Sequence, residues 1–437
     1  MIHNSQPVVA FATLGCKVNT YDTETMTALF EQANYRIGHF NEMADVYVVN
    51  TCTVTHLADR KSRNMLRRAK KRNPKAIVVA VGCYVQVASK ELESLKEVDI
   101  LIGTGNRNRI LDYIETFKQK GQQANYVIQE ESATDLEELS ITETTGRTRA
   151  FLKIQEGCNQ YCTYCIIPFA RGGLKSRTPD RVLQEVIGLC EKGYREIVLT
   201  GIHLASYGYE TGNRDALIEL IQTLDRRTDI DRIRLGSLDP RMMTETFFER
   251  LAKVESFCPH FHLSLQSGSD TVLKRMGRYY TAQAYQGIVE MSRRAFPMAA
   301  ITTDVLVGFP GETEEEFQET LAFVETIGFY QIHVFKYSPR QGTKAASMPN
   351  QIAEEIKNRR SQTLIAVGKK LEDAFLKQHH GRVEEVLVEK EENGLFLGYT
   401  ANYIPVVIEN NEDIKGKISK YVLLYNRNAL EMKGIKP

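Results

Sequence analysis

Residues 156–168 read EGCNQYCTYCIIP, and the cysteine spacing in this stretch decides how the rest of the chain is interpreted. Cys158, Cys162 and Cys165 form a C-x3-C-x2-C array. Three thiolates so close in sequence can bind three irons of a cubane cluster if a tight loop wraps that cluster. A zinc site is the alternative, but zinc usually needs four closed ligands, and no fourth Cys or His lies close in sequence. We therefore predict a cluster-binding loop.

The predicted cluster has one iron without a protein ligand. Such an iron can chelate the amino and carboxylate groups of S-adenosylmethionine (SAM) and pass one electron to its sulfonium. Cleavage then yields methionine and a 5′-deoxyadenosyl radical, which abstracts hydrogen from an unreactive C–H bond. The motif therefore predicts radical chemistry.

Strands and helices alternate after the motif in a way that predicts an α/β fold. Apolar strands are expected near residues 150–155, 196–200, 232–236, 260–266, 301–308 and 331–337. Six strand–helix units within residues 147–376 predict a partial (β/α)6 barrel rather than a complete eightfold one.

The first 120 residues predict a separate, small parallel α/β domain. Its expected strands are residues 8–14, 46–50, 76–82 and 98–103. Cys16, Cys52 and Cys83 each follow one of these strands, and the carboxyl ends of parallel strands face one crevice. The three thiols are therefore expected to converge and to hold a second cluster, whose open iron could bind exogenous sulfur. Buried cysteines without metal are the alternative, because Cys is a common core residue.

Two further segments complete the predicted domain organisation. Residues 129–146 hold six acids and no Lys or Arg, so residues 121–146 are interpreted as a solvated linker. From residue 377 to 437 the apolar period becomes two, which predicts a small β-barrel. Its aromatic residues could stack on bases, although such alternation is more typical of a barrel core. They are Phe396, Tyr399, Tyr403, Tyr421 and Tyr425.

The composition is that of a globular protein with balanced charge. The 437 residues include 56 Lys and Arg against 55 Asp and Glu, so a nucleic-acid surface requires charge segregation. No apolar run is long enough to span a membrane, and the N-terminus lacks a secretion signal. We therefore expect a cytoplasmic protein without a membrane segment, whose eight cysteines stay reduced.

Charge segregation is clear in residues 60–75, which contain nine Lys or Arg and no acid. A narrow apolar stripe at helical spacing predicts a helix, with Arg60, Arg63, Arg67 and Lys71 together on another face. Such a face matches a phosphate backbone, although charge runs are usually solvated helix surfaces. We interpret it as an RNA contact.

With Tyr164 before its third cysteine, the 158–165 motif resembles that of the radical SAM superfamily. The resemblance implies that strand-end segments line the SAM pocket. It implies SAM contacts from Tyr164, Gly201, His203, Gln266 and Asp304, each of which also has a purely structural interpretation.

The whole chain resembles the methylthiotransferase family within that superfamily. There, cysteines at the positions of Cys16, Cys52 and Cys83 hold an auxiliary 4Fe-4S cluster that supplies sulfur. Those at Cys158, Cys162 and Cys165 hold the radical SAM 4Fe-4S cluster, and the C-terminal barrel is an RNA-binding TRAM domain. The stretch LGCKVNTYDTE (14–24) is similar to the branch that modifies threonylcarbamoyladenosine in tRNA.

The resemblance implies a reaction that uses two SAM molecules, one as methyl donor and one as radical source. The target would be C2 of N6-threonylcarbamoyladenosine next to the anticodon, which would become 2-methylthio-N6-threonylcarbamoyladenosine. The partners would be tRNA, SAM, an external electron donor and a sulfur source. Two alternatives stay open, namely methylthiolation of a ribosomal-protein aspartate and a two-cluster electron carrier that binds RNA without reacting.

Overall fold

The computed structural model describes residues 6–128, 148–410, 412–426 and 431–437. These fall into two compact units. The first, here the N-terminal unit, comprises residues 1–144, 155–176 and 338–346. The second, the barrel unit, comprises residues 145–154, 177–337 and 347–437. Most of the predicted linker lies outside the described residues, and no described helix is long and apolar enough to cross a membrane.

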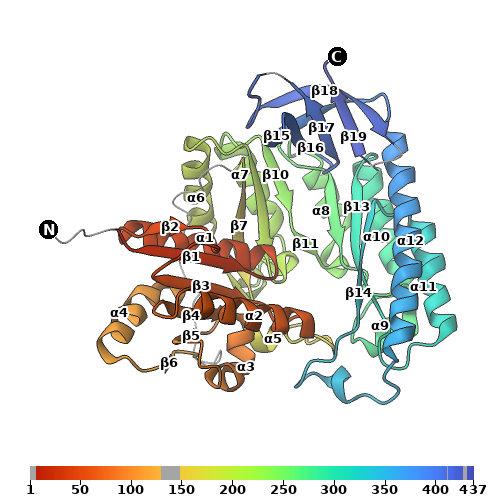
Figure 1. The fold of residues 1–437 in the computed structure, drawn as a ribbon. Helices are drawn as coiled ribbons and strands as arrows, with labels where there is room; N and C mark the ends of the chain where they lie inside the picture. Colours follow the sequence, from red (N-terminus) through yellow and green to blue (C-terminus); the bar gives the residue numbers. More distant parts are fainter. Residues whose placement is uncertain (1–5, 129–147, 411, 427–430) are drawn as a thin grey trace. The chain divides into compact units, whose positions relative to one another are not determined.

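The N-terminal unit is built on one parallel sheet with the strand order β2-β1-β3-β4-β5-β6 (Figure 1). The four predicted strands are confirmed, and two short edge strands join them. The strands are β1 Val8–Thr13, β2 Arg36–Gly38, β3 Val46–Thr51, β4 Ile77–Gly82, β5 Ile100–Ile102 and β6 Ala124–Asn125.

Helices cover both faces of this sheet because its central strands are apolar on both sides. Every residue of β3 and of β4 is buried. Leu66 of α2 and Val85 of α3 pack on one face, whereas Phe30 of α1 and Ile114 of α4 pack on the other. The helices are α1 Lys17–Gln32, α2 His56–Arg72, α3 Cys83–Glu93 and α4 Ile110–Lys120.

The barrel unit confirms all six predicted strands. They are β7 Arg149–Glu156, β9 Glu196–Gly201, β10 Arg232–Leu235, β12 His260–Leu263, β13 Ala300–Val307 and β14 Gln331–Lys336. Strands β7, β9 and β10 belong to one sheet, and a short strand, β11 Ser237–Leu238, begins a second sheet in the order β11-β12-β13-β14. The helices are α6 Pro179–Glu191, α7 Ala216–Arg227, α8 Glu245–Leu251, α9 Asp270–Arg275, α10 Ala282–Ala295, α11 Glu314–Ile327 and α12 Glu354–Gln378.

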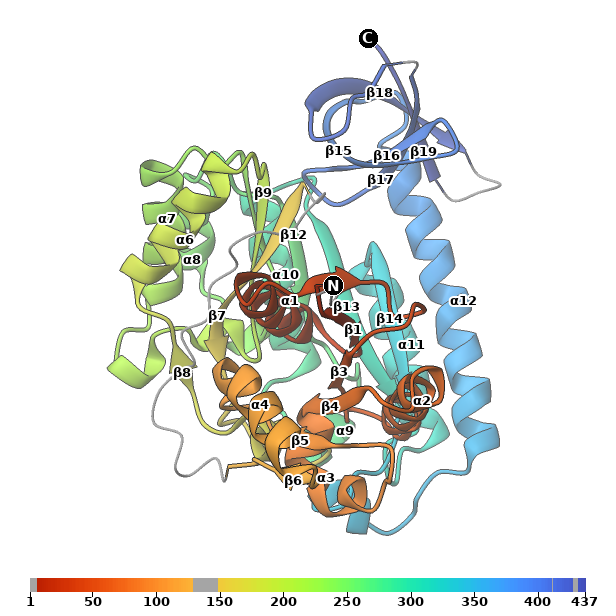
Figure 2. The same ribbon diagram turned by 60° about the vertical axis from the view of Figure 1, so that its left-hand side comes forward.

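The C-terminal strands close into a five-stranded barrel beyond the end of α12 (Figure 2). Four strands were predicted, and β19 was not, because its sequence EMKGI has only two large apolar residues. The strands are β15 Val383–Glu392, β16 Leu395–Thr400, β17 Pro405–Glu409, β18 Ile418–Asn426 and β19 Glu431–Ile435.

The five aromatic residues of this barrel differ in burial. Phe396 and Tyr421 belong to its core. Tyr399 and Tyr403 stack on each other with ring centroids 5.0 Å apart, and the guanidinium of Arg149 lies over both rings. The core interpretation therefore describes Phe396 and Tyr421, whereas the rings of Tyr399 and Tyr403 are covered by a guanidinium.

Candidate iron–sulfur sites

Cys16, Cys52 and Cys83 follow three strands that are neighbours in the N-terminal sheet. Strand β3 pairs in parallel with β1 on one side and with β4 on the other. Cys16 immediately precedes α1, and Cys83 is the first residue of α3. Because these strands are parallel neighbours, the strand order brings the three cysteines to the same end of the sheet, as predicted.

Two glycines allow the strand ends to come close together. Gly15 and Gly82, which precede Cys16 and Cys83, have φ angles of +104° and +102°. A Cβ atom on Gly15 would lie 2.9 Å from Cys52 Cβ, and one on Gly82 would lie 2.6 Å from Asn50 Oδ1. Both positions therefore exclude a side chain by space as well as by backbone conformation.

The three thiols follow neighbouring strand ends, and burial together with their mutual repulsion affects the pKa values of Cys52 and Cys83. Burial, with a smaller contribution from the thiols of Cys83 and Cys16, raises the pKa of the Cys52 thiol to about 11. Burial also raises the pKa of Cys83, and the nearby Arg171 guanidinium opposes that rise. In the absence of metal, these buried thiols are therefore held protonated.

Arg171 brings a buried positive charge to this group. Its Nε donates to Cys83 Sγ at 3.1 Å, and its Nη1 donates to Asp22 at 2.9 Å and to Glu156 at 2.8 Å. The side chain is fully buried, and Arg107 pairs with the same Asp22 carboxylate. A guanidinium at this distance stabilises a thiolate on Cys83.

These features fit a cubane cluster with three thiolate ligands. Each cysteine comes from a different strand end, the surroundings of Cys52 and Cys83 exclude water, and Arg171 offsets part of the negative charge that thiolates and cluster would bring. Cys16 is the exposed member, so a fourth, external ligand would have access from its side.

The loop that carries Cys158, Cys162 and Cys165 is closed by contacts between its first residues and the segment at Gly172 and Gly173. Cys158 N donates to the carbonyl of Gly172 at 2.9 Å, and Cys165 N donates to that of Cys162 at 3.0 Å. A Cβ atom on Gly157, whose φ is +74°, would lie 1.7 Å from the Gly173 carbonyl oxygen. The backbone therefore makes the tight turn that the cysteine spacing requires for wrapping a cluster.

The helix that follows this loop connects the two cysteine groups. It is α5, Ile167–Arg171, and its last residue is the arginine that contacts Cys83. Tyr164, between the second and third loop cysteines, is half-buried. Both candidate cluster sites are thus parts of one compact unit.

Four of the five residues expected to contact SAM lie in the barrel unit, whereas Tyr164 belongs to the N-terminal unit. Gly201 ends β9, and His203 follows it with Nε2 3.3 Å from Asp239 Oδ2. Burial would raise the pKa of Asp239, but hydrogen bonds from Arg241 and His203 hold it well below its usual range. Gln266, with φ of +69°, lies just beyond β12, and its backbone pairs with β13.

Asp304 differs from the other three because it lies within β13 rather than at a strand end. Its Oδ2 is 3.2 Å from Nε2 of His262 on the adjacent strand β12. Its expected role as a SAM contact stays a prediction.

The basic segment forms α2, as predicted, and buries Leu66 and Ala69. Arg60, Arg67 and Lys71 are exposed. Arg63 is half-buried, where it donates to Glu91 at 2.9 Å and to the hydroxyl of Tyr84. Three of the four predicted RNA-contacting residues are therefore accessible, and Arg63 is held by protein partners.

Sequence reasoning missed the buried charges around Cys83. Arg171 and Asp22 are 149 residues apart, and isolated charged residues are ordinarily assigned to the surface. One available signal was the Gly-Cys pair in both LGCKVN and VGCYVQ, because glycine marks a close backbone approach.

Sequence profiles match both units. The profile described as "Uncharacterized protein family UPF0004" matches residues 8–103, and that of the Radical SAM superfamily matches residues 152–324. Among solved structures, the radical SAM methyltransferase TsrM from Kitasatospora setae has a TM-score of 0.59 at 15% identity, covering 78% of this chain and 77% of that one. The fold and the cysteine loop thus define a radical SAM enzyme.

Curated relatives extend over nearly the whole chain. Threonylcarbamoyladenosine tRNA methylthiotransferase MtaB of Bacillus subtilis is 44% identical over 95% of this chain and 93% of its own length. The Aquifex aeolicus protein of the same name is 39% identical over 95% of this chain and 100% of its own. A tRNA-2-methylthio-N(6)-dimethylallyladenosine synthase of Carboxydothermus hydrogenoformans is 34% identical over 93% and 94%. The chain belongs to the radical SAM methylthiotransferase family, in the MtaB branch.

Proposed function

We propose that this enzyme transfers a methylthio group to C2 of N6-threonylcarbamoyladenosine next to the anticodon of tRNA. The product is 2-methylthio-N6-threonylcarbamoyladenosine. The observation that carries the proposal is the pair of cysteine triads within one compact unit, in a chain 44% identical to a relative with that named activity. The cofactors are two 4Fe-4S clusters and SAM.

The two cysteine groups have different roles in this proposal. Cys158, Cys162 and Cys165 hold the radical SAM cluster, and Cys16, Cys52 and Cys83 hold the auxiliary cluster. When bound, the clusters and SAM supply an electron, a carbon radical and the sulfur that is transferred. The chain itself supplies the tight 157–173 loop, the buried Arg171 that favours thiolate at Cys83, and the buried strand ends that carry Cys52 and Cys83.

Other residues are proposed to bind the two substrates. Gly201, His203 and Gln266 at strand ends, together with Tyr164, are proposed to contact SAM. Arg60, Arg67 and Lys71 on α2 are proposed to bind the phosphate backbone of tRNA, because they are exposed and like-charged. The reaction also needs an external electron donor and a sulfur source, and a tRNA substrate implies that the enzyme works in the cytoplasm.

The decisive measurement is mass spectrometry of nucleosides from tRNA incubated anaerobically with reconstituted enzyme, SAM, reductant and sulfide. We expect a methylthio group on threonylcarbamoyladenosine. Formation of 5′-deoxyadenosine without any changed nucleoside would overturn the tRNA substrate and direct attention to a ribosomal-protein aspartate. Absence of 5′-deoxyadenosine under the same conditions would favour the electron-carrier alternative.

Variants of each cysteine triad test whether one group is needed for SAM cleavage and the other for sulfur transfer. Cys162→Ala is expected to abolish SAM cleavage, whereas Cys52→Ala is expected to retain cleavage and lose methylthiolation. Each variant should keep half of the iron. Cys190→Ala, which changes a half-buried thiol on α6 outside both triads, is the matched control and should keep both activities. Residual methylthiolation by Cys52→Ala would contradict the assigned role.

A further inference from the structure

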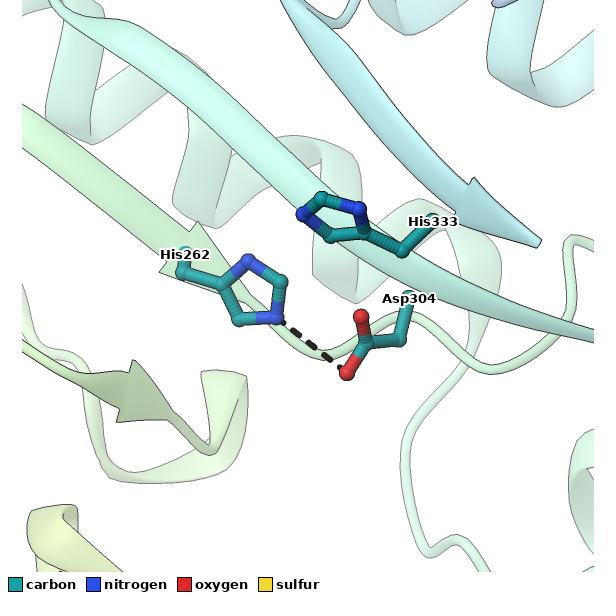
Figure 3. A group of neighbouring side chains, drawn as sticks. All are labelled: His262, Asp304 and His333. Carbon is teal, nitrogen blue, oxygen red and sulfur yellow. Dashed lines mark ion pairs between the residues drawn. The ribbon is translucent and has the colours of Figure 1, made fainter. Parts of the chain in front are cut away.

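Three side chains that no step above requires as a group meet on adjacent strands of the barrel unit. His262 lies on β12, Asp304 on β13 and His333 on β14 (Figure 3). One ligand atom from each lies within 4.8 Å of the other two. Two imidazoles and a carboxylate from three neighbouring strands therefore point to one spot.

The strand register produces this grouping. Asp304 pairs directly with His333, and His262 pairs with Thr302, two residues before Asp304. Residues two apart on a strand share a face, so all three side chains project from the same side of the sheet. The three positions are thus held by backbone pairing.

The contacts of His262 resemble those of a metal-ligating histidine. Its Nε2 is 3.2 Å from Asp304 Oδ2, close to the separation of about 3.3 Å between two ligands of a tetrahedral zinc ion. Its Nδ1 is 2.9 Å from Thr302 Oγ1, which fixes the ring orientation. Such a hydrogen bond from the second ring nitrogen is a regular feature of histidine ligands.

The surroundings favour a cation at this spot. Asp304 is about seven-tenths buried, with a side-chain exposure of 29%, and His262 is 15% exposed. Within the described residues, the ion partner of Asp304 is a histidine rather than a Lys or Arg. The rings of His262 and His333 lie with centroids 5.7 Å apart, on the side of the sheet from which Asp304 also projects.

We propose that His262, Asp304 and His333 form a binding site for one divalent transition-metal ion of the zinc or iron(II) type. Imidazole and carboxylate ligands in this ratio suit such ions. Three protein ligands leave at least one coordination position for water or another small oxygen or nitrogen ligand. The site uses none of the six cluster-binding cysteines, so its metal content can be measured separately from the cluster iron, although Asp304 is also an expected SAM contact.

Zinc itself is the probe. Reconstituted holoenzyme is dialysed anaerobically against low-micromolar Zn²⁺, passed through a desalting column and analysed for zinc and iron. We expect one zinc per chain in addition to the cluster iron. Asp304→Asn and His333→Ala should lose the zinc and keep the iron, which also verifies that both variants fold. His380→Ala, at an exposed histidine after α12, is the matched control and should bind zinc normally.

The ligand set is tested by zinc X-ray absorption. We expect only nitrogen and oxygen neighbours at about 2.0–2.2 Å, with the scattering pattern of imidazole. A sulfur shell at about 2.3 Å would mean that zinc occupies a cysteine site, and it would overturn the proposal. Two other outcomes would also overturn the proposal: unchanged zinc content in Asp304→Asn and His333→Ala, or no retained zinc in the unsubstituted enzyme. Either result would identify the group as a hydrogen-bonded His–Asp pair.

Discussion

The guanidinium of Arg171 donates a hydrogen bond from Nε to the sulfur of Cys83 at 3.1 Å, with both side chains buried. Arg171 ends the helix that follows the 158–165 loop, whereas Cys83 begins α3. A residue next in sequence to one cysteine group thus sets the electrostatics of the other.

Replacing Arg171 by Met should destabilise the fold strongly. The change leaves Asp22 and Glu156 with one fewer buried cation, and breaking a buried pair from one side costs about 3–5 kcal/mol. We expect a corresponding fall in the free energy of unfolding measured by anaerobic urea titration. Arg109→Met removes an exposed ion pair with Asp112 and should cost less than about 1 kcal/mol. Equal losses in the two variants would contradict the structural role of Arg171.

Arg171→Lys distinguishes the effect of the positive charge at residue 171 from the effect of the hydrogen bonds that the guanidinium makes. Lysine keeps the positive charge but lacks the planar guanidinium that donates to four partners, namely Cys83, Asp22, Glu156 and Asn19. We expect the reduction potential of the auxiliary cluster to fall in Arg171→Met and to be largely restored in Arg171→Lys, because a nearby cation favours the reduced cluster. Potentiometric EPR measures both. An unchanged potential in Arg171→Met would show that Cys83 does not ligate the cluster.

Gly82→Ala should disrupt the auxiliary site selectively. The new Cβ would lie 2.6 Å from Asn50 Oδ1 and 2.8 Å from the Thr51 carbonyl oxygen, so the strand ends must move apart. Overpacking of this kind costs about 1–3 kcal/mol, and we expect loss of up to half of the iron while SAM cleavage persists. Gly121→Ala is the control, because Gly121 also has a positive φ but nothing within 4 Å of the new Cβ. If both variants lost iron equally, backbone conformation rather than close approach would be responsible.

Removing exposed charge from α2 should weaken tRNA binding. Arg60 and Lys71 are exposed and, within the described part of the chain, have no ion pair. Arg60→Ala with Lys71→Ala should reduce affinity and lower the slope of log K against log salt by about 0.7–0.9 for each phosphate that the variant no longer neutralises. Arg226→Ala with Arg227→Ala, at two exposed arginines that end α7, removes the same charge and should change binding little. Equal effects of the two pairs would indicate a nonspecific response to net charge.

Arg63→Ala provides a second comparison on the same helix. Because Arg63 is already held by Glu91 and Tyr84, we expect its loss to affect tRNA affinity less than the loss of Arg60. Filter binding at several salt concentrations measures all of these variants. A larger effect for Arg63→Ala would show that its bonds to Glu91 and Tyr84 give way when RNA binds.

Cys52 in iron-free protein should react slowly and with a steep pH dependence. With a pKa of about 11, roughly one Cys52 in a thousand is thiolate at pH 8. Its alkylation by iodoacetamide should therefore rise about tenfold for each pH unit up to pH 10. Mass spectrometry of labelled peptides follows this reaction, and the exposed Cys16 should be labelled first. A rate that levels off by pH 9 would contradict the raised pKa.

Much of the architecture was predictable from local patterns. The alternation of strands and helices located all six barrel strands, and the change to a period of two located four of the five C-terminal strands. These predictions succeeded because strand and helix periods are local properties of the chain. The strand β19 was missed because closure of the barrel, rather than its own apolar pattern, makes EMKGI a strand.

The sequence by itself determined the chemistry, because C-x3-C-x2-C and the strand-end cysteines limit what the chain can ligate. Only the tertiary structure decided which distant side chains meet. Arg171 contacts a thiol 88 residues away, and His262, Asp304 and His333 face one another through strand register. No local period records such contacts, since they depend on which strands become neighbours and on which buried charges find a partner.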